Sequence, residues 1–273
     1  MNAMSLKAKI RNIAKDKNIS AQVVLQNYFF ERFLDRLSRS EYQEKFIIKG
    51  GLLIAIMAGL DTRSTMDLDA TVRSLPLDEK NISKTINDIC SIAIDDGITF
   101  EVVRIDFIRE DDEYGGFRVS LSAKYDTIVS PLSIDITAGD VITPKPIVRL
   151  FKSFFDDTVQ FKVWVYNTET ILAEKVETIL RRSVGNTRPR DFYDVYLISK
   201  TQKFNRDTFR KALCATAEYR KSTEIISNVS EILDAIEQSP TLNNHWKKYA
   251  SEYPYAKGVL YEDVIKAVRN LMG

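Results

Sequence analysis

The sequence predicts an α+β fold, with a mixed β-sheet and flanking helices in residues 1–160 and a helical bundle in residues 161–273. Two observations support this prediction. Segments whose apolar residues alternate, which is typical of a half-buried strand, crowd between residues 46 and 137 with few helices between them. From Thr168 onward, the segments instead have the apolar spacing of helices. Strands so close together favour a mixed or antiparallel sheet that is covered on one face.

The first forty residues predict a pair of helices. Ser20 is the expected N-cap of the second helix, because its hydroxyl can accept a hydrogen bond from a free amide of the first turn. This helix repeats apolar residues four apart, at Leu25, Phe29, Phe33 and Leu37, which predicts a core stripe. A DNA-reading helix-turn-helix is the alternative, but its second helix would carry outward Arg, Asn or Gln in place of aromatic residues.

Short motifs predict the elements that follow. "KFIIKGG" indicates a strand that ends in a glycine turn, "LLIAIMAGL" a helix and "MDLDATV" a strand, with a helix over about 78–96 after it. Three further strands are predicted from "TFEVVRIDFI", "GFRVSLSAKY" and "PLSIDIT", the first two separated by the acidic turn "REDDEYGG". In the last third, helices are predicted over "TETILAEKVETILRRS", "RDFYDVYLIS", "RDTFRKALCATAEY", "STEIISNVSEILDAIEQ" and "VLYEDVIKAVRNLM".

The composition argues against several classes of protein. Lys and Arg number 39 against 38 Asp and Glu, so the net charge of +1 gives no global attraction to nucleic acid or membrane. The longest apolar run, from Leu52 to Leu60, is far shorter than the ~18 residues of a membrane span. The polar N-terminus has no signal-peptide core, so we expect a cytoplasmic protein. A single histidine, His245, leaves no second imidazole for a His-rich zinc site and argues against Ser-His-Asp or Cys-His catalysis.

Two aspartates on one predicted strand are the first candidate site. Asp67 and Asp69 are two residues apart, so their carboxylates leave one face of the strand roughly 6–7 Å apart, and they can share divalent cations. Two-metal catalysis usually needs a third carboxylate, and Asp135 in "SIDIT" is the best candidate, either as a metal ligand or as a base. The alternative is a solvated sheet face that carries ordinary charged residues.

A glycine pair stands before the helix that leads to this strand. Gly50 and Gly51 would let the backbone approach a ligand closely, and the first-turn amides of the helix would face a phosphate. A plain strand-to-helix turn is the alternative reading of the glycines. Combined with the aspartate pair, they are typical of a site that holds a nucleoside triphosphate and its magnesium.

A second cluster is predicted in the helical half. Ile171, Lys175 and Ile179 are spaced four apart, so Lys175 lies on or beside the apolar stripe of its helix and must snorkel, pair or bind an anion. Asp191 and Asp194 share one face of the next predicted helix. The pair could be a nucleotide-binding group or a buried structural ion pair.

Five ordered motifs, "FIIKGGLLI", "RSTMDLD", "IDIT", "LAEKVETIL" and "RPRDFYDVY", together resemble the AbiEii/AbiGii family of nucleotidyltransferase toxins, which share the DNA polymerase β-like fold. The resemblance spans nearly the whole chain, although the last seventy residues carry no recognisable motif. It implies metal binding by Asp67 and Asp69, nucleotide contact by Lys175 and an essential acidic role for Asp191.

The resemblance also implies a function. We expect a magnesium-dependent enzyme of a type IV toxin–antitoxin or abortive-infection system, acting in phage defence, that transfers NMP from an NTP to RNA, with tRNA as the expected acceptor. A separately encoded antitoxin would act without a stable complex, and the enzyme would be a monomer that binds no membrane. The expected nucleotide-binding residues are Lys49, Gly50, Gly51, Arg63, Thr65 and Lys175, and the expected RNA-binding residues are Arg181, Arg182, Arg188 and Arg190. An ordinary solvated helix end is the alternative for these arginines.

Two other functions remain open from the sequence. A small-molecule nucleotidyltransferase of the aminoglycoside-modifying kind would need an acidic cleft in the helical half, whereas an RNA acceptor would need a basic one. A catalytically silent binding module would hold metal and nucleotide without turnover.

Overall fold

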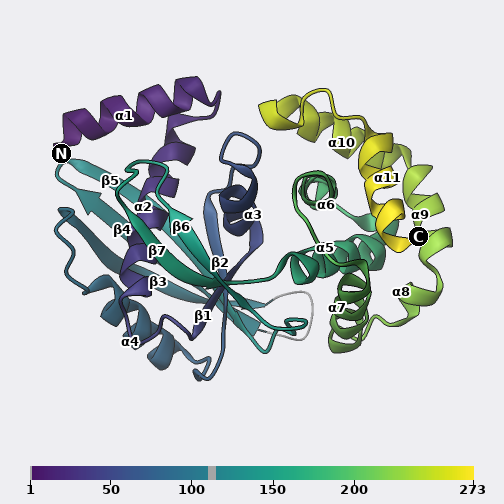
Figure 1. The fold of residues 1–273 in the computed structure, drawn as a ribbon, viewed down its shortest axis with the longest axis horizontal. Coiled ribbons are helices and arrows are strands. Elements are labelled where there is room, and N and C mark those ends of the chain that lie inside the picture. The colour runs from purple at the N-terminus through teal and green to yellow at the C-terminus, as the bar shows by residue number, and fades with distance from the viewer. Residues whose placement is uncertain (1, 110–114) are drawn as a thin grey trace. The chain divides into compact units, whose positions relative to one another are not determined.

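The computed structural model describes residues 2–109 and 115–273, and the chain divides into two compact units (Figure 1). The sheet unit consists of Met1–Asp140 and Ile147–Val165, and the helical unit consists of Val141–Pro146 and Tyr166–Gly273. The acidic turn predicted between two of the strands falls at residues 110–114 and so lies outside the described residues.

Within the described residues, seven strands form one sheet in the order β3-β4-β5-β2-β1-β7-β6. The strands are β1 Phe46–Lys49, β2 Asp67–Val72, β3 Ile98–Arg109, β4 Gly115–Tyr125, β5 Ile128–Ala138, β6 Ile147–Lys152 and β7 Gln160–Val165. The β2–β5 and β1–β7 pairs are parallel and the other pairs are antiparallel. This confirms the predicted mixed sheet with flanking helices.

The helices of the sheet unit are α1 Ala3–Asp16, α2 Ala21–Ser38, α3 Gly50–Ala58 and α4 Glu79–Cys90. Ser20 caps α2 as predicted, since its hydroxyl accepts from the Val23 amide at 3.2 Å. The expected stripe is buried at Phe29, Phe33 and Leu37, and α2 packs against β5 and β7. Its residues from Gln26 to Leu37 are all buried, so α2 is a core helix and offers no exposed face for reading DNA.

Charged side chains on α2 are buried with this core. Arg36 donates to both carboxylate oxygens of Asp96, at 2.8 and 2.9 Å. Glu31 accepts from the Ser153 hydroxyl at 2.5 Å and from the Phe154 amide at 2.8 Å. Burial nevertheless raises the pKa of Glu31 to about 7, because desolvation of the carboxylate outweighs these hydrogen bonds and the charge of Arg32.

The helical unit contains α5 Thr168–Arg182, α6 Pro189–Thr201, α7 Arg206–Tyr219, α8 Glu224–Ser227, α9 Val229–Glu237, α10 Pro240–Glu252 and α11 Tyr261–Met272. Helix α5 packs against α6 and α7, with Leu172, Val176 and Ile179 fully buried. The sequence predicted one helix where α8 and α9 are separated by Asn228, and it did not predict α10. No helix in the described part of the chain combines the length and apolarity of a membrane span.

A short segment, Val141–Pro146, leaves the sheet and joins the helical unit before the chain returns to form β6 and β7. Asn167 holds it there. Its amide nitrogen donates to the carbonyls of Thr143 and Lys145, each at 2.9 Å, while its oxygen caps α5 by accepting from the Thr170 amide at 2.8 Å. The Thr143 amide in turn donates to the Thr170 hydroxyl at 3.0 Å.

Candidate active site

The three predicted aspartates lie on neighbouring strands of the sheet. On β2 the side chains of Leu68 and Ala70 are fully buried, so those of Asp67 and Asp69 leave the opposite, half-buried face. Strand β5 runs parallel to β2, with Asp135 in register with Asp69. Strand pairing therefore brings the aspartates together across almost seventy residues of sequence.

Arg118 on β4 is a member of this cluster that the sequence analysis missed. It is in antiparallel register with Asp135, and its guanidinium donates through Nε and Nη2 to both carboxylate oxygens, at 2.7 and 2.6 Å. This fork, followed by the charges of Asp67 and Asp69, raises the pKa of Arg118 above its usual value. The alternation of "GFRVSLSAKY" could place Arg118 on the polar face, but only the strand order shows that it lies beside Asp135.

The glycine turn lies against the same aspartates. β1 is antiparallel to β2 with Lys49 in register with Asp69, and α3 begins at Gly50, where φ is +67°. A Cβ at Gly50 would overlap the carboxylate of Asp69 and lie 2.8 Å from its Cβ, so only glycine fits. No side chain caps the start of α3 at its N-cap, Lys49, which leaves the first-turn amides available for a ligand.

Two further predicted nucleotide ligands surround Gly51. A Cβ at this position would lie 3.0 Å from the Thr65 hydroxyl and 3.2 Å from Nη2 of Arg63. Arg63 is buried and donates to the Ser64 carbonyl. Lys49, the remaining member of the predicted set in this unit, pairs with Asp140 at 2.5 Å. The structure thus gathers the glycine turn, Arg63, Thr65 and the aspartates in one region, whereas Lys49 already has a carboxylate partner.

The second predicted cluster forms within the helical unit. Lys175 on α5 pairs with Asp191 on α6 at 2.5 Å and with Asp194 at 3.0 Å. The two carboxylates are almost fully buried, and the lysine side chain is 18% exposed. Carboxylates buried to this extent need an ion-pair partner whether or not Lys175 also binds a nucleotide. The geometry is therefore compatible with both interpretations of Lys175, as a nucleotide ligand and as a member of a structural ion pair.

The four arginines predicted to bind RNA differ in their surroundings. Arg181 donates to the buried carboxylate of Glu177 at 2.8 Å, and Glu177 also pairs with Arg220 at 2.6 Å. Arg182 is half-buried, whereas Arg188 and Arg190 at the start of α6 are exposed. Only Arg188 and Arg190 therefore present an exposed guanidinium to a ligand.

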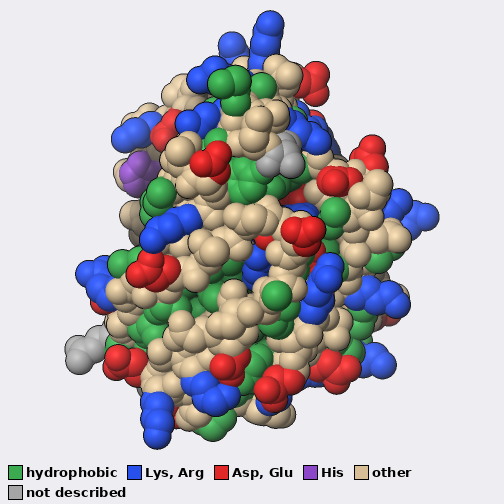
Figure 2. Space-filling view, turned by 90° about the vertical axis from the view of Figure 1, so that its left-hand side faces the viewer, with side chains coloured by type: hydrophobic (Ala, Val, Ile, Leu, Met, Phe, Trp, Pro, Cys, Tyr) green, Lys and Arg blue, Asp and Glu red, His purple; other side chains and the backbone are tan. Residues whose placement is uncertain are grey.

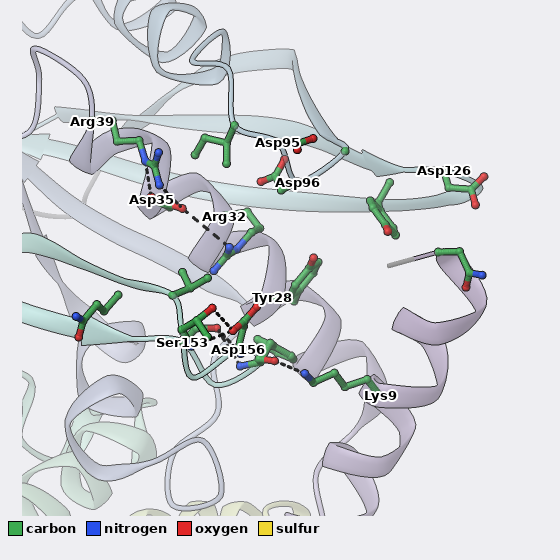
Figure 3. A pocket seen from close by; sticks show the side chains of 18 residues that line it. Lys9, Tyr28, Arg32, Asp35, Arg39, Asp95, Asp96, Asp126, Ser153 and Asp156 are labelled. Carbon is green, nitrogen blue, oxygen red and sulfur yellow. Dashed lines mark hydrogen bonds and ion pairs between the residues drawn. The ribbon is translucent and has the colours of Figure 1, made fainter.

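A large hollow in the sheet unit, of about 1010 Å³, lies away from the predicted residues, and none of them lines it. Figure 3 shows Lys9 of α1, Tyr28 and Arg32 of α2 and Arg39 just after α2 around it, with Arg39 paired to Asp35 at 2.8 Å. Its lining mixes acidic and basic side chains, so it shows no preference for an anion. Charges of both signs are also interspersed over the face in Figure 2, in keeping with the net charge of +1.

The donor chemistry of the aspartates suits a hard divalent cation, which prefers carboxylate oxygens. Among the described residues, however, no group of three or more His, Cys, Asp or Glu side chains is placed to hold a metal ion. Asp135 is bound at both oxygens by Arg118. Asp67 and Asp69 fit a metal by type and by face, whereas a metal at Asp135 would share the carboxylate with Arg118.

Residues 32–267 match the family of nucleotidyl transferase AbiEii toxins of type IV toxin–antitoxin systems. Among curated proteins, none matches the chain. Similar solved structures include a candidate nucleotidyltransferase from H. pylori (14% identity, 93% of this chain and 96% of that chain, TM-score 0.49). Two others are JHP933 from Helicobacter pylori (13%, 93% and 93%, 0.49) and an antigenic nucleotidyltransferase-like protein from Paracoccidioides brasiliensis (12%, 89% and 92%, 0.35). All three TM-scores are below 0.5, so membership of a family is inferred from the match over residues 32–267 alone.

Proposed function

Because the chain belongs to the AbiEii family of nucleotidyltransferase toxins of type IV toxin–antitoxin systems, we propose that it transfers NMP from an NTP to an RNA acceptor, with tRNA the first acceptor to test. The main support for this proposal is that the glycine turn and the three aspartates lie together in the sheet unit. A glycine turn at the start of α3 lies against Asp69, and Asp67 and Asp135 share the same face of the sheet.

We propose Mg²⁺ as the metal, held by Asp67 and Asp69. When bound, it would neutralise charge on the triphosphate and favour the attacking form of the acceptor oxygen. The chain's own groups bind the rest of the nucleotide. The amides of the α3 turn would donate to phosphate oxygens, with Arg63 and Thr65 beside them, and no side chain at Gly50 or Gly51 blocks that approach.

The chemistry is an exchange of two bonds at the α-phosphorus. The acceptor hydroxyl oxygen forms a bond to this phosphorus, the bond to the bridging oxygen breaks, and pyrophosphate leaves with the electron pair. The hydroxyl proton passes to a nearby carboxylate. Asp135 is our candidate for this base. Each of its oxygens accepts one hydrogen bond from Arg118, so the proton would reach a remaining lone pair of the carboxylate.

The roles proposed for Lys175 and Asp191 are those that the family resemblance implies. Lys175 would neutralise charge on the phosphates, and Asp191, which holds it at 2.5 Å, would orient it. The NTP affinity of Lys175→Arg tests this. We expect weaker binding than in wild type, whereas unchanged affinity would assign Lys175 a purely structural role.

The decisive experiment measures transfer directly. The protein is incubated with each labelled NTP in turn, Mg²⁺ and total RNA, and the products are separated by size. We expect label in an RNA band with wild type and none with Asp67→Asn or Asp69→Asn, whose melting temperatures should match wild type because no packing is lost. Label that appears only in small molecules would favour the aminoglycoside-type alternative. Binding of NTP without any transfer would favour the silent module.

Toxicity and partners follow from the acceptor. A tRNA extended past its 3′ end cannot be aminoacylated, so expression should stop growth, and Asp69→Asn at matched expression should not. Equal growth of the two strains would contradict the toxin function. The family implies a separate antitoxin. We propose that it acts without a stable complex, that the enzyme is a cytoplasmic monomer and that it serves phage defence. Light scattering of the enzyme alone tests whether it is a monomer, and light scattering with the purified antitoxin tests whether a stable complex forms. Phage challenge tests the role in phage defence.

A further inference from the structure

A hollow of about 420 Å³ lies within the helical unit, between the start of α6 and one side of α10. The residues that line it include Arg188, Arg190, His245, Lys248, Tyr249 and Tyr253. All of them belong to the helical unit, so the hollow is formed by one unit alone. Helix α10 is the helix that the sequence analysis missed, and it carries the chain's one histidine.

The lining of this hollow is basic. Arg188, Arg190 and Lys248 are exposed, and among the described residues none of the three side chains takes part in an ion pair. Glu252 is the one acidic residue of the lining, so the lining has a net charge of +2 with histidine neutral. The start of α6 adds the positive end of a helix of 13 residues, whose N-cap has no side-chain hydrogen bond. An anion of the size of a phosphate therefore has several unpaired cationic partners here.

The hollow also has an aromatic wall. The rings of Tyr249 and Tyr253 are 4.7 Å apart between centroids, with their planes tilted by 37°. Tyr249 is buried among Trp246, Tyr193 and Tyr255, whereas Tyr253 is half-buried and keeps part of its surface open.

Hydrogen bonds fix the cluster behind this wall. Trp246 donates to the Val259 carbonyl at 3.0 Å, and Tyr193 donates to the Tyr255 carbonyl at 3.1 Å. The ring of Tyr253 packs against two members of this cluster, Tyr249 and Tyr255, with centroids 4.7 and 5.4 Å apart. A ring packed in this way loses little conformational freedom when a base stacks on it, so Tyr253 is a preorganised platform.

We propose that this hollow binds an unpaired nucleotide of the RNA acceptor, with its base stacked on Tyr253 and its flanking phosphates held by Arg188, Arg190 and Lys248. The inference depends on the proposed RNA acceptor and names the subsite that holds it. Single-stranded nucleic acid is bound through this combination of aromatic faces and cationic side chains, and the binding tolerates many sequences because every base has a π-face. A basic lining also contradicts what an acidic aminoglycoside cleft would require.

The stacking part is tested by fluorescence anisotropy of the full chain with a labelled single-stranded RNA hexamer, in EDTA and without NTP. Loss of one base stack is worth ~1–3 kcal/mol, so Tyr253→Leu should weaken binding about tenfold. Tyr253→Phe keeps the ring and should bind as wild type does. Tyr196→Leu is the matched control, because Tyr196 is a half-buried tyrosine of the same unit that does not line the hollow.

The electrostatic part is tested by the salt dependence of the same binding. Replacing Arg188 and Arg190 together by Gln should reduce the slope of log K against log salt by about 1.4, at ~0.7 per phosphate contact. The control is the pair Lys203→Gln and Lys211→Gln, two exposed lysines of the helical unit outside the hollow, which should leave the slope unchanged. The salt-dependence measurement tests the site even if Tyr253→Leu fails to fold.

The outcomes separate this inference from the proposed function. If Tyr253→Leu melts as wild type does and binds the hexamer equally well, the subsite is refuted, although transfer to RNA could still be observed. If excess NTP displaces the hexamer in EDTA, the hollow is a free-nucleotide site and the inference is also refuted. If no RNA is labelled by any NTP but the hexamer binds through Tyr253, the transfer proposal fails and the RNA site remains.

Discussion

Gly50→Ala tests whether the close approach of the α3 turn to Asp69 is needed for transfer. Gly50 has a φ of +67°, a region that side chains with a Cβ adopt with strain, and an added Cβ would overlap the Asp69 carboxylate. The substitution must therefore move either the turn or Asp69. Both outcomes would separate the predicted phosphate-binding amides from the predicted metal ligand.

The expected magnitudes come from two separate effects. The left-handed backbone costs an alanine about 1–2 kcal/mol, which should lower the free energy of unfolding by that amount. Displacement of a catalytic group by ~1 Å can cost about 100-fold in rate, so transfer should fall by about this factor. Gly258→Ala separates the effects, because Gly258 has a φ of +86° and a Cβ there would meet nothing within 4 Å.

The assay compares the two variants for initial rate of RNA labelling and for unfolding in urea. Both should lose stability, Gly50→Ala more than Gly258→Ala because its Cβ must also displace Asp69 or the turn, and only Gly50→Ala should lose transfer. Wild-type transfer by Gly50→Ala would refute the reasoning, since it would mean that the turn and Asp69 can separate without consequence. An equal loss in Gly258→Ala would show that backbone strain alone explains the effect.

Three other substitutions test charged groups of the two units. Arg118→Met removes the cation that binds Asp135, so the affinity of the protein for Mn²⁺, measured by EPR, should rise. The expected rise is about fivefold, which corresponds to the ~1 kcal/mol of an exposed ion pair. Weaker Mn²⁺ binding would instead show that Arg118 supports the metal site. Burial raises the pKa of Glu31 to about 7 from 4.5, so its contribution to stability is full in acid and is lost as the pH rises through 7. Urea unfolding from pH 4.5 to 8 should show up to about 3 kcal/mol of this loss in wild type relative to Glu31→Gln, and parallel profiles would exclude it. Lys175→Met removes the ammonium that pairs with the buried carboxylates of Asp191 and Asp194, so it should lower the free energy of unfolding by ~3–5 kcal/mol, whereas an unchanged melting temperature would show that this ion pair does not stabilise the fold.

The parts of the fold that depend on local patterns were predictable from the sequence. The alternation of Asp67, Leu68 and Asp69 is set by the two-residue period of a strand, and it gave the buried face of β2 correctly. The helix after the glycine pair and the cap at Ser20 follow from similarly local chemistry. The family resemblance, drawn from five short motifs, is confirmed by a match over residues 32–267.

The features that were missed depend on distant partners. Strands β6 and β7 pair with each other and β7 also pairs with β1, and the composition around them gave no clear strand signal. Helix α10 has a polar and aromatic sequence. Its buried face, formed by Leu242, Trp246 and Tyr249, can be recognised only from the packing of the helical unit. The fork between Arg118 and Asp135 similarly requires the strand order, which no local pattern contains. The predicted roles of the site residues stay predictions until the substitutions are made.

Neither unit is a continuous stretch of chain, because residues 141–146 are inserted between two strands of the sheet and yet belong with α5. A fragment that starts at Tyr166 would lack the two carbonyls that Asn167 binds, and a fragment that ends at Asp140 would lack β6 and β7. During synthesis, the ribosome must release residues through Val165 before the sheet can close, by which time the first piece of the helical unit has already emerged. The chain therefore cannot be divided into its sheet unit and its helical unit by a single cut, and exchange of either unit between relatives requires at least three junctions.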